Sequence, residues 1–152
     1  MSNVTRARAM AFGAACATLV ATACGDDPAG PIDAVAGSYE ATQWVITTDT
    51  DSWDLLAGGG HLRITLNPDG TTTGEYFIPA GVSPAPGRQS EDGPVDARID
   101  LAGTWSLEGD VVTFDHPTDT YLKFVDWEVT QPGELFNAHV NGPYTFRTDL
   151  RR

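Results

Sequence analysis

Apolar and polar residues alternate in short runs along most of the chain after residue 34. In residues 61–67, Leu62, Ile64 and Leu66 point one way and the polar residues between them point the other. A period of two residues is that of a β-strand with one buried face. Further runs with alternating, aromatic or β-branched residues occupy positions 37–48, 71–78, 95–101, 103–108, 111–116, 134–140 and 144–150. Because no segment keeps the 3.6-residue period of a helix, the pattern predicts an all-β fold.

Residues that favour tight turns separate neighbouring runs, as expected for hairpins: Pro68-Asp69-Gly70, Gly109-Asp110 and Asn141-Gly142. The hairpin over residues 103–116 should bury Trp105, Leu107, Val112 and Phe114. A sheet of eight or nine antiparallel strands that exposes one face to solvent must bury its other face. Only closure of the sheet into a barrel also removes its free edges. We therefore predict a small antiparallel up-and-down barrel of eight or nine strands.

Three segments interrupt the alternation. In residues 49–60, Asp51 or Ser52 can cap a helical turn that carries Trp53, so we predict one short helical turn after the first strand. In residues 120–130 the apolar positions change phase midway, which predicts a bulge or bend near Val125. Residues 79–94 contain four prolines and three glycines and predict a long irregular loop.

The first 23 residues have the three parts of a bacterial export signal. Arg6 and Arg8 give a positively charged start, residues 9–21 are apolar without acid or lysine, and small residues follow. The apolar run is too short to span about 30 Å of hydrocarbon as a stable helix. The segment predicts export, with residues 1–23 removed.

The end of this signal, Ala21-Thr22-Ala23-Cys24, resembles the lipobox of bacterial lipoproteins, although the family prefers Leu where Ala21 stands. The same residues also satisfy the Ala-x-Ala rule of ordinary secretion. The resemblance implies that Cys24 becomes the lipidated N-terminus and anchors the protein to an envelope membrane, since two or more acyl chains bind stably. Residues 24–33 then form a flexible tether and residues 34–152 the barrel domain.

Charge narrows the range of partners. Without the signal the chain keeps seven of its nine basic residues and all 21 acidic ones, a net charge of −14. Nucleic acid needs a basic surface, so we expect no nucleic-acid partner. The same charge disfavours direct adsorption to anionic lipid, which leaves Cys24 as the expected membrane contact.

Several turn-and-strand motifs allow a resemblance to be stated: GSY at residues 37–39, LNPDGT at 66–71, GTWSLEGD at 103–110 and VTF at 112–114. With these motifs the domain resembles the lipocalin-like β-barrels of small bacterial lipoproteins. Tyr39 stands where lipocalins carry Trp in the first strand. The resemblance covers nearly the whole domain and implies the architecture rather than a particular activity.

The domain is rich in large aromatic residues, which could line a cavity for a small apolar ligand or could fill the core. The candidate pocket residues are Trp44, Trp53, Tyr121 and Trp127. Our leading hypothesis is non-enzymatic binding of a small apolar molecule in the barrel mouth, with Trp53 and residues 79–94 as lid elements. The alternative is a solid-core structural module, or one that binds another envelope protein. A cavity beneath Trp53 would favour the first.

Two groups of ionisable residues could carry other chemistry: Asp49, Asp51 and Asp54, and Asp115, His116 and Asp119. The first group departs from the usual calcium-loop spacing, and helix capping and solvation account for it. The second lacks a nucleophile in a recognisable motif and is more simply a turn at a strand end. We therefore expect no metal site, no catalytic residue and no cofactor.

Overall fold

The computed structural model describes residues 31–82, 89–90, 93–118 and 121–152, and the alternating segments form strands in it. The elements are α1 (Pro31–Val35), β1 (Gly37–Thr47), β2 (Ser52–Asp54), β3 (His61–Leu66), β4 (Thr71–Ile78), β5 (Gln89–Ser90), β6 (Gly93–Pro94), β7 (Ala97–Asp100), β8 (Gly103–Glu108), β9 (Val111–Asp115), the 3₁₀ helix η1 (Tyr121–Phe124), β10 (Trp127–Gln131), β11 (Glu134–Asn141) and β12 (Tyr144–Arg151). Cys24 lies outside the described residues. No helix among the described residues is long and apolar enough to cross a membrane.

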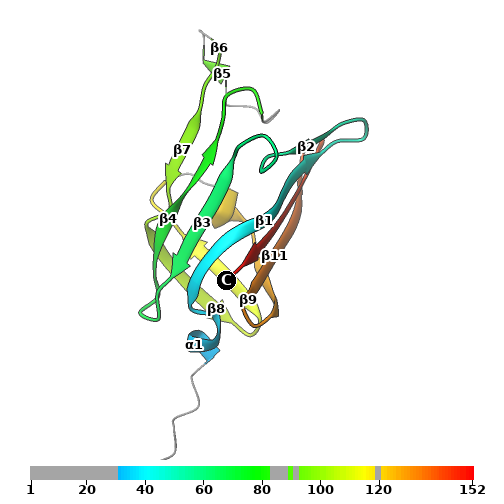
Figure 1. The fold of residues 1–152 in the computed structure, drawn as a ribbon. Coiled ribbons are helices and arrows are strands. Elements are labelled where there is room, and N and C mark those ends of the chain that lie inside the picture. Colours follow the sequence, from blue (N-terminus) through cyan, green and yellow to red (C-terminus); the bar gives the residue numbers. More distant parts are fainter. Residues whose placement is uncertain (1–30, 83–88, 91–92, 119–120) are drawn as a thin grey trace, which may run out of the picture.

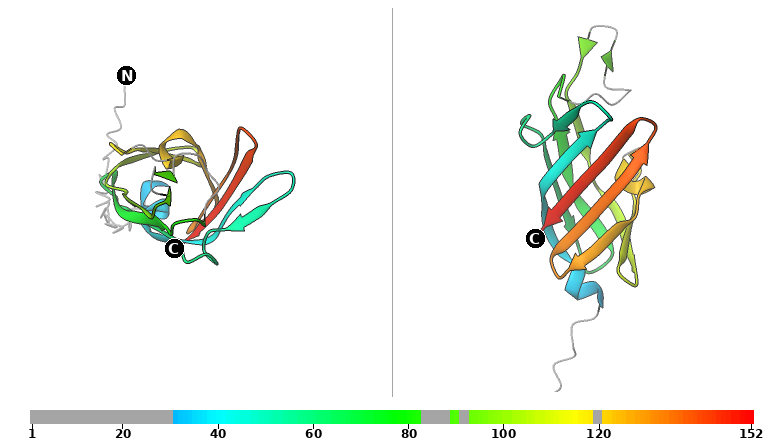
Figure 2. Two further views of the ribbon diagram at one scale, coloured as in Figure 1. Left: turned by 90° about the horizontal axis from the view of Figure 1, so that it is seen from above. Right: turned by 90° about the vertical axis from the view of Figure 1, so that its right-hand side faces the viewer.

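The strands close into an antiparallel barrel, which confirms the predicted fold class. Within the described residues, eight strands follow one another around the wall in the order β1, β3, β4, β8, β9, β10, β11, β12, and β12 pairs with β1 to close it. The ring is visible from above in Figure 2, and Figure 1 shows the strands from the side. Two further strands extend the wall, because β2 pairs with the end of β1 and β7 pairs with β4.

Alternation along the strands places the predicted apolar residues inside. Leu62, Ile64 and Leu66 of β3 are at most 1% exposed. On the hairpin of β8 and β9, Trp105 and Val112 are buried, as predicted, and they belong to one continuous hydrophobic core. The two-residue period of the sequence therefore identified the inner face correctly.

One end of the barrel is closed by α1, which lies beneath the strands in Figure 1. The Tyr39 hydroxyl donates to the Val35 carbonyl at 2.5 Å, and the Arg152 guanidinium donates to the Ala36 carbonyl at 2.6 Å. The helix takes in the last three residues of the expected tether. We call the opposite end, where β1 ends and the β11–β12 hairpin turns, the mouth.

The predicted turn within residues 49–60 begins later than expected, at Asp54, where the Gly58 N–H donates to the Asp54 carbonyl at 3.0 Å. Trp53 lies instead in strand β2, opposite Ile46 of β1, and the Leu55 N–H continues the ladder by donating to the Trp44 carbonyl. Asp54 does cap a turn, since its Oδ1 accepts from the backbone N–H of Leu56 at 3.0 Å. The expected place of Trp53 in that turn was wrong because a free edge of β1 was available for pairing, which local capping signals do not reveal.

Residues 121–130 follow the prediction in part: the chain bends at Val125, as expected, but a short helix precedes the bend. The one-turn helix η1 ends at Phe124, and β10 begins only at Trp127. Leu122 of η1 is buried, and Val125, just beyond the helix, is partly buried against the core. Phe124 is 67% exposed, although it lies in the same helix as Leu122. The helix accounts for the change of phase.

The structure describes part of the long loop predicted at residues 79–94. Residues 83–88 and 91–92 lie outside the described residues. Strands β5 and β6 pair as a short ladder.

The last hairpin turns at Gly142 and Pro143, one residue later than expected, because Asn141 still pairs with Tyr144. Gly142 supplies the positive φ of 61° that this turn needs.

Strand β4 changes neighbour at Gly74. Thr72 pairs with β8, whereas residues from Glu75 onward pair with β7. A β-carbon at residue 74 would lie 2.2 Å from the Arg63 carbonyl oxygen, and φ there is +145°. Only glycine fits this approach of two backbones, which bends β4 around the barrel.

Candidate functional site

The side chain of Tyr121 occupies the barrel interior near the mouth. Among the described residues, five other aromatic or imidazole rings lie around it, with ring centroids 6.0–6.4 Å from its own. They are Trp44 of β1, Tyr76 of β4, Trp127 of β10, His139 of β11 and Phe146 of β12. We call the space bounded by these five rings the Tyr121 slot. Tyr121 itself comes from η1 and not from the wall.

Strand register explains why distant residues meet in the slot. Across β1, β12 and β11, Trp44 lies opposite Thr148, and Thr148 lies opposite Asn137. His139 lies opposite Phe146 in the same hairpin, and their rings stack at 4.7 Å and 4°. Residues directly opposite in an antiparallel sheet project from the same face, which here is the inner one.

Polar groups at the slot are few and buried. The Tyr121 hydroxyl lies 3.3 Å from the hydroxyl of Thr148, a residue with no exposed surface. Asn137 donates from Nδ2 to the Asp126 carbonyl at 2.7 Å, so its Oδ1 accepts from Nδ1 of His139 at 2.8 Å. The hydrogen-bond network thus assigns the His139 proton to Nδ1.

Burial controls the charge state of these groups. Desolvation raises the pKa of the Tyr121 phenol above its usual value, and the bond to Thr148 offsets only part of that rise. Desolvation also lowers the pKa of His139. Both effects disfavour the charged forms, so the slot is neutral at physiological pH.

One buried donor at the slot has no acceptor. Trp127 has no exposed surface, and its ring packs edge-on against Phe114 and tilted against Tyr121. Its indole Nε1–H is the one buried side-chain polar atom among the described residues that lacks a hydrogen-bond partner. A buried unsatisfied donor costs about 1–3 kcal/mol, so an acceptor there would be favourable.

A hollow beside η1 adjoins the slot. It measures about 330 Å³ and opens to solvent between η1 and β11. Its lining residues are Phe124, Val125, Asp126, Glu128, Phe136, Asn137, Ala138 and His139. His139 belongs to both the hollow and the slot, so the two adjoin at β11.

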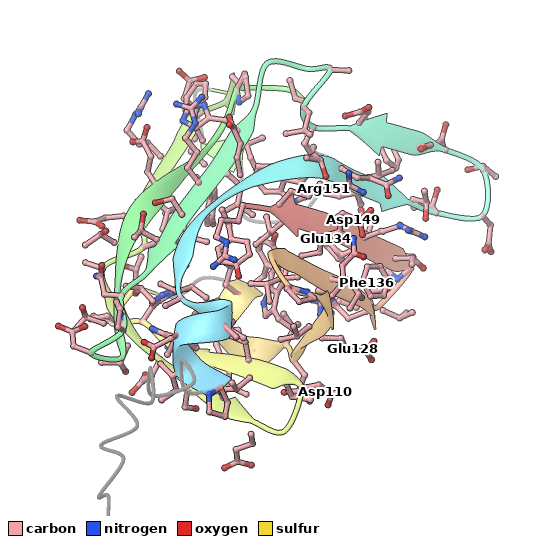
Figure 3. All side chains as sticks on the ribbon, turned by 60° about the horizontal axis from the view of Figure 1, so that its bottom comes forward. Asp110, Glu128, Glu134, Phe136, Asp149 and Arg151 are labelled. Carbon is pink, nitrogen blue, oxygen red and sulfur yellow. The ribbon has the colours of Figure 1, made fainter. Side chains whose placement is uncertain are left out.

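A second hollow, of about 380 Å³, lies on the outer face of β11 and β12. Figure 3 shows Glu134, Phe136, Asp149 and Arg151 on these two strands. Its charges are already paired: Arg151 contacts Glu134 at 3.1 Å, and Arg147 contacts Asp149 at 3.5 Å. Paired, exposed charges suit an apolar ligand less well than the aromatic slot does.

The slot contains three of the four predicted pocket residues. Trp44 and Trp127 are at most 1% exposed, and Tyr121 lies between them. Trp53 is partly buried on β2 and is not among the rings that surround Tyr121. The hollows described above do not include Trp53 in their linings.

Sequence reasoning missed Tyr76, His139 and Phe146 as slot residues. Phe146 stands in the run at positions 144–150, but nothing local showed which level of the barrel its ring would occupy. That level depends on the register of β11 with β12 and of β12 with β1. If the last turn had been predicted one residue later, at Gly142 and Pro143, the register would have paired His139 with Phe146.

The two ionisable groups considered for other chemistry lie elsewhere. His116 is 1% exposed and stacks on Phe114, with Nε2 3.1 Å from the Thr72 hydroxyl. That hydroxyl donates to the Leu101 carbonyl, so His116 donates from Nε2. Burial lowers the pKa of His116. Asp119 lies outside the described residues, and the part of the chain that is described contains no group of three potential metal ligands.

Comparison with known proteins yields no match. No family model matches the chain, and neither does a curated protein or a solved structure. The geometry of the slot and its surroundings is therefore the basis for the functional proposal.

Proposed function

We propose that this protein is a non-enzymatic, lipid-anchored β-barrel of a bacterial envelope that binds a small apolar molecule at the barrel mouth. The observation that carries the proposal is the Tyr121 slot, in which five strands present rings around a side chain from a separate one-turn helix. Because η1 is not part of the strand ladder, withdrawal of Tyr121 would break no bond between strands. A ligand would take the place of its ring.

The dimensions of the barrel are consistent with this exchange. An eight-stranded barrel has an interior that is either just filled by side chains or able to hold one small ligand. Tyr121 fills the interior here, and His139 at the slot's edge also lines the hollow of about 330 Å³ beside η1. The lipocalin-like sequence motifs also support a ligand-binding barrel.

The anchor would orient the mouth away from the membrane. Lipidated Cys24 precedes α1, and α1 lies at the end of the barrel opposite the mouth (Figure 1). Two or more acyl chains on Cys24 would hold the protein stably. A ligand would then enter from the aqueous side of the membrane.

Tryptophan fluorescence tests the proposal, since Trp44 and Trp127 line the slot. We expect saturable quenching when the purified chain is titrated with small apolar molecules, and a higher midpoint of thermal unfolding at saturation. The quenching should be reduced in Trp44→Phe. If neither fluorescence nor the unfolding midpoint responds to a panel of such molecules, ligand binding is refuted.

A second candidate, a solid-core module that binds another envelope protein, is favoured by two observations. Rings fill the slot, and four large apolar side chains of the described residues are exposed, most of all Phe124 at 67% and Val140 at 72%. Crosslinking in the envelope distinguishes the candidates. A protein-binding module should lose its crosslinked partner in Phe124→Glu and Val140→Glu, whereas a ligand-binding barrel should show no partner to lose.

A further inference from the structure

The shape of the Tyr121 slot selects for a flat ring. Three of its rings lie nearly parallel to that of Tyr121: Trp44 at 25°, His139 at 19° and Phe146 at 23°. Tyr76 and Trp127 are tilted, at 56° and 42°. Aromatic pairs favour such offset-stacked and tilted arrangements. A planar aromatic ring keeps all five contacts, whereas a puckered aliphatic ring of equal size keeps fewer.

The polar groups at the slot select for a hydroxyl on that ring. The hydroxyl of fully buried Thr148 faces the phenolic oxygen of Tyr121 at 3.3 Å, and a ligand without oxygen would leave Thr148 without this contact. A phenolic hydroxyl both donates and accepts, so an aromatic alcohol in the place of Tyr121 can keep the contact with Thr148.

From these two features, and resting on the ligand-binding function proposed above, we infer that the natural ligand is a phenolic compound whose ring replaces that of Tyr121 in the slot. Tyr121 is then an internal competitor that resembles the ligand. The observed affinity of a protein is reduced by the fraction of molecules in the competent state. Wild-type protein should therefore bind the ligand more weakly than a variant whose slot is empty.

The test uses the full lipidated chain in lipid nanodiscs and three probes: p-cresol, toluene and 4-methylcyclohexanol. p-Cresol matches the Tyr121 side chain, toluene lacks its hydroxyl, and 4-methylcyclohexanol lacks its planarity. Dissociation constants are measured by tryptophan fluorescence for wild type, for Tyr121→Ala and for Phe124→Ala. Phe124→Ala is the matched control, because Phe124 is in the same helix but is exposed to solvent.

We expect Tyr121→Ala to bind p-cresol at least about fivefold more tightly than wild type does, and about fivefold more tightly than it binds toluene or 4-methylcyclohexanol. Phe124→Ala should bind like wild type. Equal affinity of Tyr121→Ala for all three probes would overturn the phenolic ligand and leave apolar ligand binding intact. If no probe binds any of the proteins, both proposals fail.

A milder variant keeps the inference testable if Tyr121→Ala does not fold. Tyr121→Phe keeps the ring but removes the hydroxyl that faces Thr148. The weakened internal competitor should let p-cresol bind about threefold more tightly than it binds wild type. Unchanged affinity for p-cresol in Tyr121→Phe would show that the hydroxyl has no part in selection and would overturn the inference.

Discussion

Replacing Trp105 with alanine should strongly destabilise the closed end of the barrel. Trp105 is 6% exposed in β8, and its Nε1 donates to the Asn67 carbonyl at 2.9 Å. That bond connects β8 to the turn between β3 and β4. The backbone N–H of Trp105 makes a second bond to the same turn, by donating to the Gly70 carbonyl. The side chain therefore contributes both apolar burial and a link between two hairpins.

The expected cost follows from these two contributions. Truncation of a buried Trp to Ala costs about 3–5 kcal/mol, through lost burial and the cavity that remains. A hydrogen bond contributes about 0.5–1.5 kcal/mol of this. Trp105→Phe keeps most of the ring but not the bond to Asn67, so it should cost about 1–2 kcal/mol. The difference between the two variants isolates ring burial.

Equilibrium unfolding in urea measures both changes. With a slope near 1.5 kcal/mol per molar urea, a cost of 4 kcal/mol lowers the midpoint by about 2.7 M. Ser106→Ala is the matched control, since Ser106 is exposed in the same strand, and it should change stability by less than about 0.5 kcal/mol. A cost under about 1 kcal/mol for Trp105→Ala would refute the assignment of this residue to the core.

Three further predictions follow from burial, backbone geometry and the anchor. Burial lowers the pKa of His116 and of His139, so unfolded chains bind more protons once the pH falls below about 6.5. Unfolding midpoints should therefore fall between pH 7.5 and pH 5.5, and a rise on acidification would contradict this. Gly74→Ala should cost at least about 1–3 kcal/mol in urea unfolding, because φ at residue 74 is +145° and a β-carbon would meet the Arg63 backbone. Cys24→Ser should move the protein from the membrane to the soluble fraction, and retention on membranes without detergent would refute the lipid anchor.

The strands could be predicted from sequence because a wall with one buried face imposes a two-residue period on each of them. Leu62, Ile64 and Leu66 show this directly, since all three were expected inside and all are buried. The closure of the barrel could not be predicted in detail from this period. It depends on pairing between β1 and β12, which are more than 90 residues apart along the chain. The need to remove free edges predicted closure in general but not its register.

The errors arose where distant contacts decide local structure. Trp53 follows residues that can cap a helix, yet the free edge of β1 drew it into a strand. Tyr121 stands in a run whose apolar positions change phase midway, and it occupies a 3₁₀ turn that directs its ring into the barrel. Neither outcome is encoded in the neighbouring residues alone. The candidate site was therefore only partly predictable, since His139 and Phe146 join it through register.

Native mass spectrometry tests the central claim most directly. The full chain with its signal would be produced in a bacterial host, purified gently from membranes and measured in the folded and then the denatured state. Ligand binding predicts an excess mass on the folded protein that disappears on denaturation and that matches a small phenolic molecule. The same excess should be absent from a variant whose slot is blocked, such as Thr148→Phe. Folded protein that carries no excess mass, even after incubation with p-cresol, would contradict the proposed function.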